Sequence, residues 1–255
     1  MLLSPTEHAR AIAEAAGLTP FPVPDHRLRA FAKSTASGRS TSRMTVYIES
    51  DGAPWRAPDQ PPWDPTPVRP LVMRMAISDP AAAVAYLGRP CQYLAEAELI
   101  HCDPELWMRA RFGDDAIAMT TQAIDRLKQF YGASEINLVG YSGGGAMAAL
   151  VAARRGDVRC LVTIAAPLDT GAWTEALGVS PLSLSRNPAD DAGAARQIVQ
   201  THFRGGRDTV VVPAVSKRFL ERAPDAVTID IKDFDHRCCW DDEWKNLWRN
   251  SCLAL

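Results

Sequence analysis

The chain contains 255 residues, of which 47% are hydrophobic and 23% are charged. These fractions are those of a globular protein and exclude a disordered chain, a collagen-like repeat and a coiled coil. With 28 basic and 30 acidic residues the net charge is −2, so the chain has no basic footprint for nucleic acid. We expect one α/β domain over residues 1–255, since single α/β domains commonly reach about 250 residues.

The sequence lacks the apolar stretches that a membrane span or an export signal requires. No window approaches the ~18 uninterrupted apolar residues of a membrane-spanning helix. The first ten residues carry Glu7, His8 and Arg10 and no apolar core, so they do not form a secretory signal as written. We therefore expect no transmembrane segment and a cytoplasmic location as written, or a periplasmic or secreted one if a signal has been removed. The oligomeric state is left open.

The first part of the chain predicts a helix, two strands and an ambiguous segment. A glycine closes the helix, and a serine-rich stretch between the strands indicates a hairpin-type loop. The expected elements are a helix over residues 6–17, strands over 27–33 and 44–49, and a strand or a helix over 81–87.

A proline-rich stretch follows the second of these strands. Residues 54–70 hold 7 of the 19 prolines. They exclude a regular helix or a central strand, because proline lacks the donor N–H. We expect an ordered loop that carries Trp55 and Trp63, with a plain spacer as the alternative.

From about residue 110 to the end, predicted helices and strands alternate. Residues 110–131 form the clearest helix, because apolar side chains recur on one face every three or four residues. This alternation is typical of a mostly parallel sheet with helices on both faces. The long connection over residues 167–199 is expected to be a lid or cap that shapes substrate choice, or else a plain surface insertion. The other expected strands cover 136–139, 159–165, 201–204 and 227–231, and the other helices cover 146–155, 214–223 and 240–250.

Residues 140–144 read Gly-Tyr-Ser-Gly-Gly between a short apolar strand and an alanine-rich helix. In the G-x-S-x-G pattern a sharp strand-to-helix turn lifts the serine, here Ser142, above the sheet. Gly140 and Gly144 are small because larger side chains would collide there. The N–H of Gly143 then lies at a helix N-terminus, where the dipole favours negative charge. Taken alone, the pattern also fits a glycine-rich packing turn, but a phosphate-binding loop would need a Gly-Lys-Ser/Thr ending that is missing.

Two later residues supply what a serine nucleophile needs, a general base and a carboxylate that orients the base. Asp208 follows one predicted strand and His236 follows the next, in the acid-then-histidine order. His236 is the only histidine after residue 202. Asp233 and Asp235 flank the histidine and are the alternative candidates for the acid.

With these residues in place, the chain resembles the α/β-hydrolase fold family from residue 44 to its closing helix. The chain departs from many members in carrying Glu49 and Ser50 where they have His-Gly at the start of the oxyanion loop. The resemblance implies an oxyanion hole made by the N–H of Gly143 and a second backbone N–H, for which Asp51 is the candidate by position. The motifs of the family lie at residues 139–144, 206–213 and 235–236. A bacterial subgroup of hydrolases with no known substrate is similar to this chain at residues 47–52, 64–67 and 89–93.

These residues together predict a serine hydrolase that works by acyl transfer. Ser142 is expected to attack a carbonyl, His236 to carry the proton, and Asp208 to hold the imidazole in the right tautomer. The expected substrate is a small-molecule ester or acyl compound, contacted by Tyr141 and Trp173, and no cofactor or metal is needed. The alternatives are a thioesterase, lipase or peptidase on the same triad, or a catalytically dead hydrolase-fold binding protein.

The six cysteines allow disulfides but form no C-x-x-C pair, so a zinc ribbon or thioredoxin-type site has no support. We predict a bridge between Cys91 and Cys102, because ten intervening residues can fold back to the ~4.4–6.8 Å between Cα atoms that a disulfide requires. Such a bridge would point to an oxidising compartment. Two buried thiols are the alternative. No metal site is expected at residues 101–103 or 236–239, because adjacent residues rarely converge on one ion.

Overall fold

The structure is a computed structural model that describes residues 3–34, 41–52, 60 and 62–255. Within these residues one sheet forms the centre of the molecule. Its strands are β1 (Leu18–Phe21), β2 (Ala30–Lys33), β3 (Arg43–Ile48), β4 (Val84–Leu87), β5 (Glu135–Tyr141), β6 (Val158–Ile164), β7 (Val199–Gly205) and β8 (Val227–Ile231).

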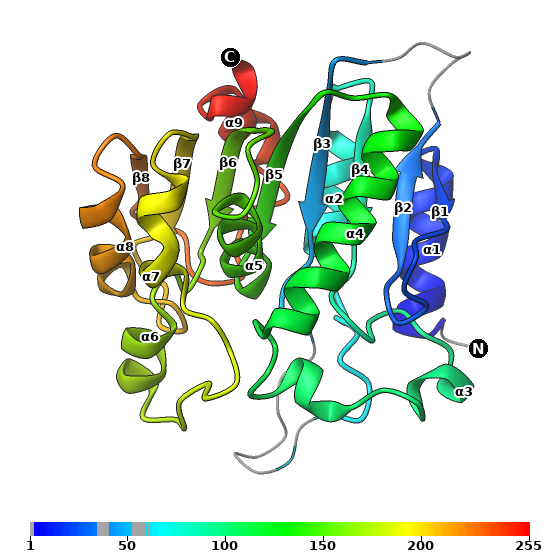
Figure 1. The fold of residues 1–255 in the computed structure, drawn as a ribbon, viewed down its shortest axis with the longest axis horizontal. Coiled ribbons are helices and arrows are strands. Elements are labelled where there is room, and N and C mark those ends of the chain that lie inside the picture. The colour runs from blue at the N-terminus through cyan, green and yellow to red at the C-terminus, as the bar shows by residue number, and fades with distance from the viewer. Residues whose placement is uncertain (1–2, 35–40, 53–59, 61) are drawn as a thin grey trace.

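The strands lie in the order β1-β2-β4-β3-β5-β6-β7-β8 (Figure 1). The six strands from β4 across to β8 are parallel. Strands β1 and β2 join the other edge in antiparallel pairing. This arrangement confirms the predicted mostly parallel α/β sheet.

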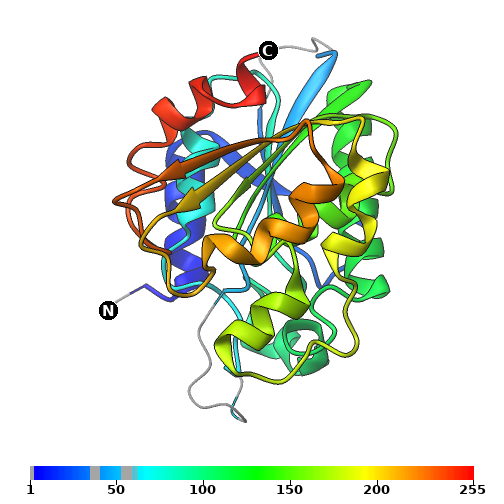
Figure 2. The same ribbon diagram turned by 90° about the vertical axis from the view of Figure 1, so that its left-hand side faces the viewer.

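Helices cover both faces of the sheet. The α-helices of the described residues are α1 (Pro5–Ala15), α2 (Leu71–Ser78), α3 (Glu96–Leu99), α4 (Asp114–Tyr131), α5 (Gly143–Ala152), α6 (Thr170–Leu177), α7 (Pro188–Asp191), α8 (Lys217–Arg222) and α9 (Trp244–Arg249). Figure 2 shows α1, α2 and α9 against one face, and α4, α5 and α7 against the other. None of the described helices has the length and apolar character needed to cross a membrane.

Two apolar cores result from this layering, one on each side of the sheet. Side chains alternate along β3, so that Val46 enters the core beneath α4 and α5 while Tyr47 enters the core beneath α1, α2 and α9. Leu150 is buried in the first core, and Trp244 in the second. The central parallel strands β3 and β5 are therefore buried on both faces, as their largely apolar sequences predict.

The longest helix, α4, ends where the sequence predicts, because Gly132 adopts a left-handed conformation with φ 61°. Its start differs from the prediction. Gly113 is the N-cap residue, so the preceding residues 110–112 form turns rather than the first turn of the helix.

The structure corrects one prediction for the N-terminal part and adds a strand that was not predicted. The strands expected to form a hairpin are β2 and β3, and they do not pair, because β4 lies between them. The loop expected to join them falls mostly outside the described residues. Strand β1 was not predicted because it contains Pro20, and it lies at the edge of the sheet, where a missing backbone donor is tolerated.

The structure also bears on three other segments, which are residues 81–87, the proline-rich loop and the expected lid. The ambiguous segment over residues 81–87 contains strand β4. Much of the proline-rich loop, including Trp55, lies outside the described residues, while Trp63 is 66% exposed. The expected lid over residues 167–199 contains α6 and α7, and α6 lies beyond the lower edge of the sheet in Figure 1, the edge at which the parallel strands end. Its role as a lid stays a prediction.

Disulfides join three pairs of cysteines. Cys91 is bonded to Cys102 with 6.2 Å between their Cα atoms, which confirms the predicted bridge. A second bridge joins Cys160 in β6 to Cys252 near the C-terminus. The two cysteines are 92 residues apart in sequence, and their Cα atoms are 5.7 Å apart. Cys238 is bonded to its neighbour, residue 239.

The two longer-range bridges should differ in how much they stabilise the fold. In the chain-entropy model the 92-residue separation contributes about 4.5 kcal/mol and the 11-residue separation about 3 kcal/mol. Replacing Cys160 and Cys252 by alanine should therefore lower the free energy of unfolding more than replacing Cys91 and Cys102. Urea unfolding of the two double variants and the wild type measures this difference. A larger loss for the Cys91 and Cys102 pair would contradict the expectation.

Candidate active site

The turn from β5 into α5 holds Ser142 in a strained conformation, with φ 52° and ψ −127°. Neighbouring glycines make this turn sterically feasible. A Cβ added to Gly140 would lie 2.2 Å from the carbonyl oxygen of Gly144. A Cβ on Gly144 would lie 2.2 Å from the carbonyl oxygen of Ile48 in β3. The glycine spacing predicted from sequence therefore has a direct steric cause, and strain of this kind is typical of functional sites.

Three predicted residues meet in one hydrogen-bonded chain. The Oγ of Ser142 lies 3.0 Å from Nε2 of His236. The Nδ1 of the same imidazole lies 2.8 Å from Oδ2 of Asp208. The Asp208 side chain is fully buried and the His236 side chain is 14% exposed. This is the geometry that a nucleophile, a base and an orienting acid require.

The loops after β7 and β8 meet because two glycines let them approach closely. A Cβ on Gly205 would lie 2.6 Å from the carbonyl oxygen of Phe234. A Cβ on Gly206 would lie 2.7 Å from the carbonyl oxygen of Lys232. The backbone N–H of Arg207 also donates to the Phe234 carbonyl at 2.9 Å. The aspartate loop and the histidine loop are thus bonded through their backbones.

The carboxylate of Asp208 is held by its own loop as well as by the histidine. Its Oδ1 accepts hydrogen bonds from the N–H groups of Val210 and Val211, at 2.8 and 2.7 Å. That leaves Oδ2 directed at His236. A buried carboxylate is retained in this way only when hydrogen bonds replace its lost hydration.

The two alternative acids point elsewhere. Asp233 forms an exposed ion pair with Arg207 at 2.7 Å. Asp235 accepts hydrogen bonds from the backbone N–H groups of Cys238 and Arg237, both at 2.7 Å, and these bonds lower its pKa. Among these three carboxylates, the structure brings Asp208 to the Nδ1 of the histidine.

The two residues predicted to contact substrate lie beside this chain of hydrogen bonds. Tyr141 is buried, its ring centroid is 5.4 Å from that of His236, and its hydroxyl donates to the His236 backbone carbonyl. Burial raises the pKa of this phenol. The indole N–H of Trp173 in α6 donates to the carbonyl of Val210 at 2.8 Å, next to the aspartate. Contact of either residue with substrate stays a prediction.

The loop after β3 lies against the start of α5, as expected for an oxyanion loop. A Cβ on Gly143 would lie 2.0 Å from Oδ1 of Asp51, so the two predicted oxyanion residues are adjacent. The Asp51 carboxylate is paired with Arg89 and Arg111, each at 3.0 Å. Neither arginine was predicted as a site residue. The only sequence signal was that Arg89 falls in the stretch similar to a bacterial subgroup of hydrolases.

Glu49, at the position where many related chains have histidine, is fully buried behind this loop. Its carboxylate accepts hydrogen bonds from the backbone N–H of Ser50 at 2.7 Å and from the hydroxyl of Tyr86 at 2.8 Å. Burial nevertheless raises its pKa above the ordinary value of 4.5.

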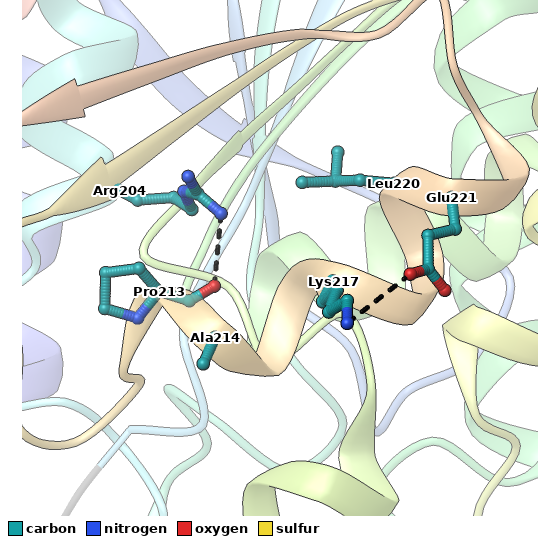
Figure 3. A pocket seen from close by; sticks show the side chains of 6 residues that line it. All are labelled: Arg204, Pro213, Ala214, Lys217, Leu220 and Glu221. Atoms are coloured by element: carbon teal, nitrogen blue, oxygen red, sulfur yellow. Dashed lines mark hydrogen bonds and ion pairs between the residues drawn. The ribbon is translucent and has the colours of Figure 1, made fainter.

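A surface hollow of about 600 Å³ beside α8 is separate from these residues (Figure 3). Its charged side chains are paired, Arg204 with Asp230 at 2.7 Å and Lys217 with Glu221 at 3.8 Å. No predicted site residue lines it, so we assign it no part in the chemistry. The lining residues are Arg204, Pro213, Ala214, Lys217, Leu220 and Glu221.

The chain matches one family model in sequence and is similar in fold to several solved structures. The α/β hydrolase fold model matches residues 29–225. The Pyrococcus furiosus esterase Pf2001 superposes with a TM-score of 0.63 and 16% identity, over 94% of this chain and 95% of that one. Est1E from Butyrivibrio proteoclasticus gives a TM-score of 0.63 and 12% identity, over 92% and 95% of the two chains. A Pyrococcus horikoshii acylaminoacyl peptidase gives 0.64 and 11%, over 90% of this chain and 39% of its own. At these identities the likeness concerns the fold. The search of curated proteins found no match.

The raised pKa of Glu49 predicts a pH-dependent contribution to stability. The folded protein binds this proton more tightly than the unfolded chain, so the contribution is complete below pH 4.5 and is lost as the pH rises through the folded pKa. The free energy of unfolding of the wild type, relative to a Glu49→Gln variant, should therefore fall as the pH rises above 4.5. Urea unfolding of both proteins across this range tests the sign. A difference that is constant or grows with pH would contradict it.

Proposed function

The chain belongs to the α/β hydrolase fold family, and from that premise we propose that it is a serine hydrolase that cleaves a carboxylic ester through an acyl-enzyme. The observation that carries the proposal is the hydrogen-bonded chain from Ser142 through His236 to Asp208. A hydroxyl, an imidazole and a buried carboxylate in this order form the arrangement that activates a serine.

In the proposed reaction His236 takes the Ser142 proton while Oγ attacks the ester carbonyl carbon. The N–H groups of Gly143 and Asp51 then face the oxygen that becomes negative. As the intermediate collapses, the C–O bond to the alcohol breaks and His236 returns its proton to the departing oxygen. Water, with His236 as base, next attacks the acyl-enzyme, releases the carboxylic acid and restores Ser142.

Asp208 keeps the imidazole in the tautomer that leaves Nε2 free to accept the serine proton, and its negative charge stabilises the imidazolium that forms. Tyr141 lies beside the same ring and helps to hold it through the hydrogen bond from its hydroxyl to the backbone carbonyl of His236. In this proposal Trp173 and the lid segment over residues 167–199 border the substrate.

An ester is the proposed bond because an alkoxide leaves more readily than an amide nitrogen. A thioesterase, lipase or peptidase would use the same three residues, and a panel of chromogenic esters, thioesters and amides of graded acyl length separates these classes. The alternative outside the enzymes is a binding protein that has the hydrolase fold but no catalytic activity. The bonded geometry and the burial of Asp208 support turnover instead, since burying an acid solely to support a binding surface would be costly.

Replacing Ser142 by alanine should abolish ester hydrolysis in a folded protein. The methyl side chain cannot form the acyl-enzyme, and loss of a triad nucleophile costs on the order of 10⁶ in kcat in a well-studied serine protease. Initial rates on the ester panel, with circular dichroism as the control for folding, measure the effect. Wild-type rates in the Ser142→Ala variant would show that Ser142 takes no part in the reaction.

The three acidic candidates should separate clearly when each is changed to the amide. Asp208→Asn would favour the wrong imidazole tautomer, a change that costs about 10⁴ in kcat in a protease triad. Asp233→Asn and Asp235→Asn are matched controls in the neighbouring loop and should retain most activity. Steady-state kinetics of the three variants compare them. A greater loss at Asp235 than at Asp208 would reassign the acid to the histidine loop.

A further inference from the structure

The carboxylate of Asp51 bridges two arginines from another part of the chain. Its Oδ1 accepts a hydrogen bond from Nη1 of Arg89, and its Oδ2 accepts one from Nη1 of Arg111, both at 3.0 Å. The arginine side chains are 4% and 11% exposed, and the aspartate side chain is 24% exposed. This ion cluster is therefore largely withdrawn from water, unlike exposed pairs such as that of Arg207 with Asp233.

The cluster lies directly beside the serine turn. The Asp51 carboxylate occupies the space that a side chain at position 143 would fill, with Oδ1 2.0 Å from the place of a Cβ on Gly143. A carboxylate so close to the proposed oxyanion would oppose the developing charge if it stood alone. One negative and two positive groups leave the cluster with a net charge of +1 instead.

Burying the Arg89 side chain costs free energy, so a contribution to stability alone does not explain its position. Burial lowers its pKa, and its Nε has no hydrogen-bond partner among the described residues. Its Nη2 donates to the backbone carbonyl of Arg111, and its guanidinium carbon lies 5.0 Å from the ring centroid of Phe112. Because buried ion pairs often contribute little net stability, a buried pair beside a reacting group suggests another purpose.

The segment that carries the arginines is itself fastened to the oxyanion loop. The side chain of Gln92 donates to the carbonyl of Ser50 at 3.0 Å and accepts from the N–H of Arg89 at 3.0 Å. Cys91, which lies between Arg89 and Gln92 in the sequence, forms a disulfide with Cys102. Contacts of Asp51 and of Ser50 beside it therefore fix the loop relative to the segment over residues 89–111.

We infer that Asp51, held by Arg89 and Arg111, is a positioning residue that sets the oxyanion loop against Gly143 while the arginines offset its charge. The inference rests on the proposed function and assigns a task to side chains that the triad does not use. A misplacement of about 1 Å in such a site can cost about 100-fold in rate. Loss of either side of the cluster should therefore slow the chemical step without removing the triad.

Two variants change the charge of the cluster in opposite directions. Asp51→Asn raises it from +1 to +2, and Arg111→Gln lowers it to 0. A purely electrostatic effect would make the first variant faster and the second slower. Positioning requires that both lose activity, because each loses one anchor of the loop.

The test measures kcat and KM for Asp51→Asn and Arg111→Gln on the best ester of the panel, with inhibition by a boronic acid that mimics the tetrahedral intermediate. We expect kcat to fall roughly 10- to 100-fold with little change in KM, and boronic acid affinity to weaken in parallel. Arg109→Gln is the matched control. It breaks an exposed pair with Glu105 two residues from Arg111 and should keep wild-type kinetics.

Wild type and Ser142→Ala are measured alongside, so that the two ideas can fail separately. Ester turnover by the wild type that survives in Ser142→Ala would defeat the proposed function and this inference with it. Serine-dependent turnover that is unchanged in both Asp51→Asn and Arg111→Gln would overturn the inference alone, as would a faster Asp51→Asn. Thermal unfolding checks that each variant is folded. If Arg111→Gln does not fold, Arg111→Lys takes its place. Lysine keeps the positive charge but lacks the planar guanidinium, so we expect the same selective loss of kcat.

Discussion

The proposed chemistry depends on one close approach, that of the β5–α5 turn to the carboxyl end of β3. Gly144 lies so near the carbonyl of Ile48 that no side chain fits between them. This contact holds Ser142 in a strained conformation with positive φ and puts Gly143 next to the loop that starts at Glu49. Backbone packing thus brings the proposed nucleophile close to the loop after β3, and the side-chain cluster around Asp51 adds to this contact at Gly143.

Around that contact the protein buries several charged or polar groups, and each is compensated differently. Asp208 is satisfied by two backbone N–H groups and an imidazole. Asp51 is balanced by two arginines. Glu49 has hydrogen bonds but no ion-pair partner among the described residues, and burial raises its pKa. Such placements cost stability and are concentrated where preorganised charge is most useful to a reaction.

Much of this site could be predicted from sequence because its signals are local. The glycine spacing around Ser142 and the strand ends before Asp208 and His236 are visible within a few residues of each. The alternation of helices and strands likewise predicted the parallel sheet. The insertion of β4 between β2 and β3 could not be predicted, because strand order depends on contacts between distant segments. The same holds for the partners of Asp51, which lie 38 and 60 residues away in sequence. Nothing near Arg89 or Arg111 indicates which carboxylate each will meet.

The central claim is that Ser142 is an activated nucleophile. A fluorophosphonate forms a covalent bond with a serine only when a neighbouring base activates it, so it reports activation without requiring knowledge of the natural substrate. Intact-protein mass spectrometry followed by peptide mapping of the treated wild type measures the number and position of the adducts. We expect one adduct, on Ser142, that forms much more slowly in the Asp208→Asn variant. An unlabelled Ser142 in a protein that hydrolyses esters, or a label on another residue, would contradict the claim.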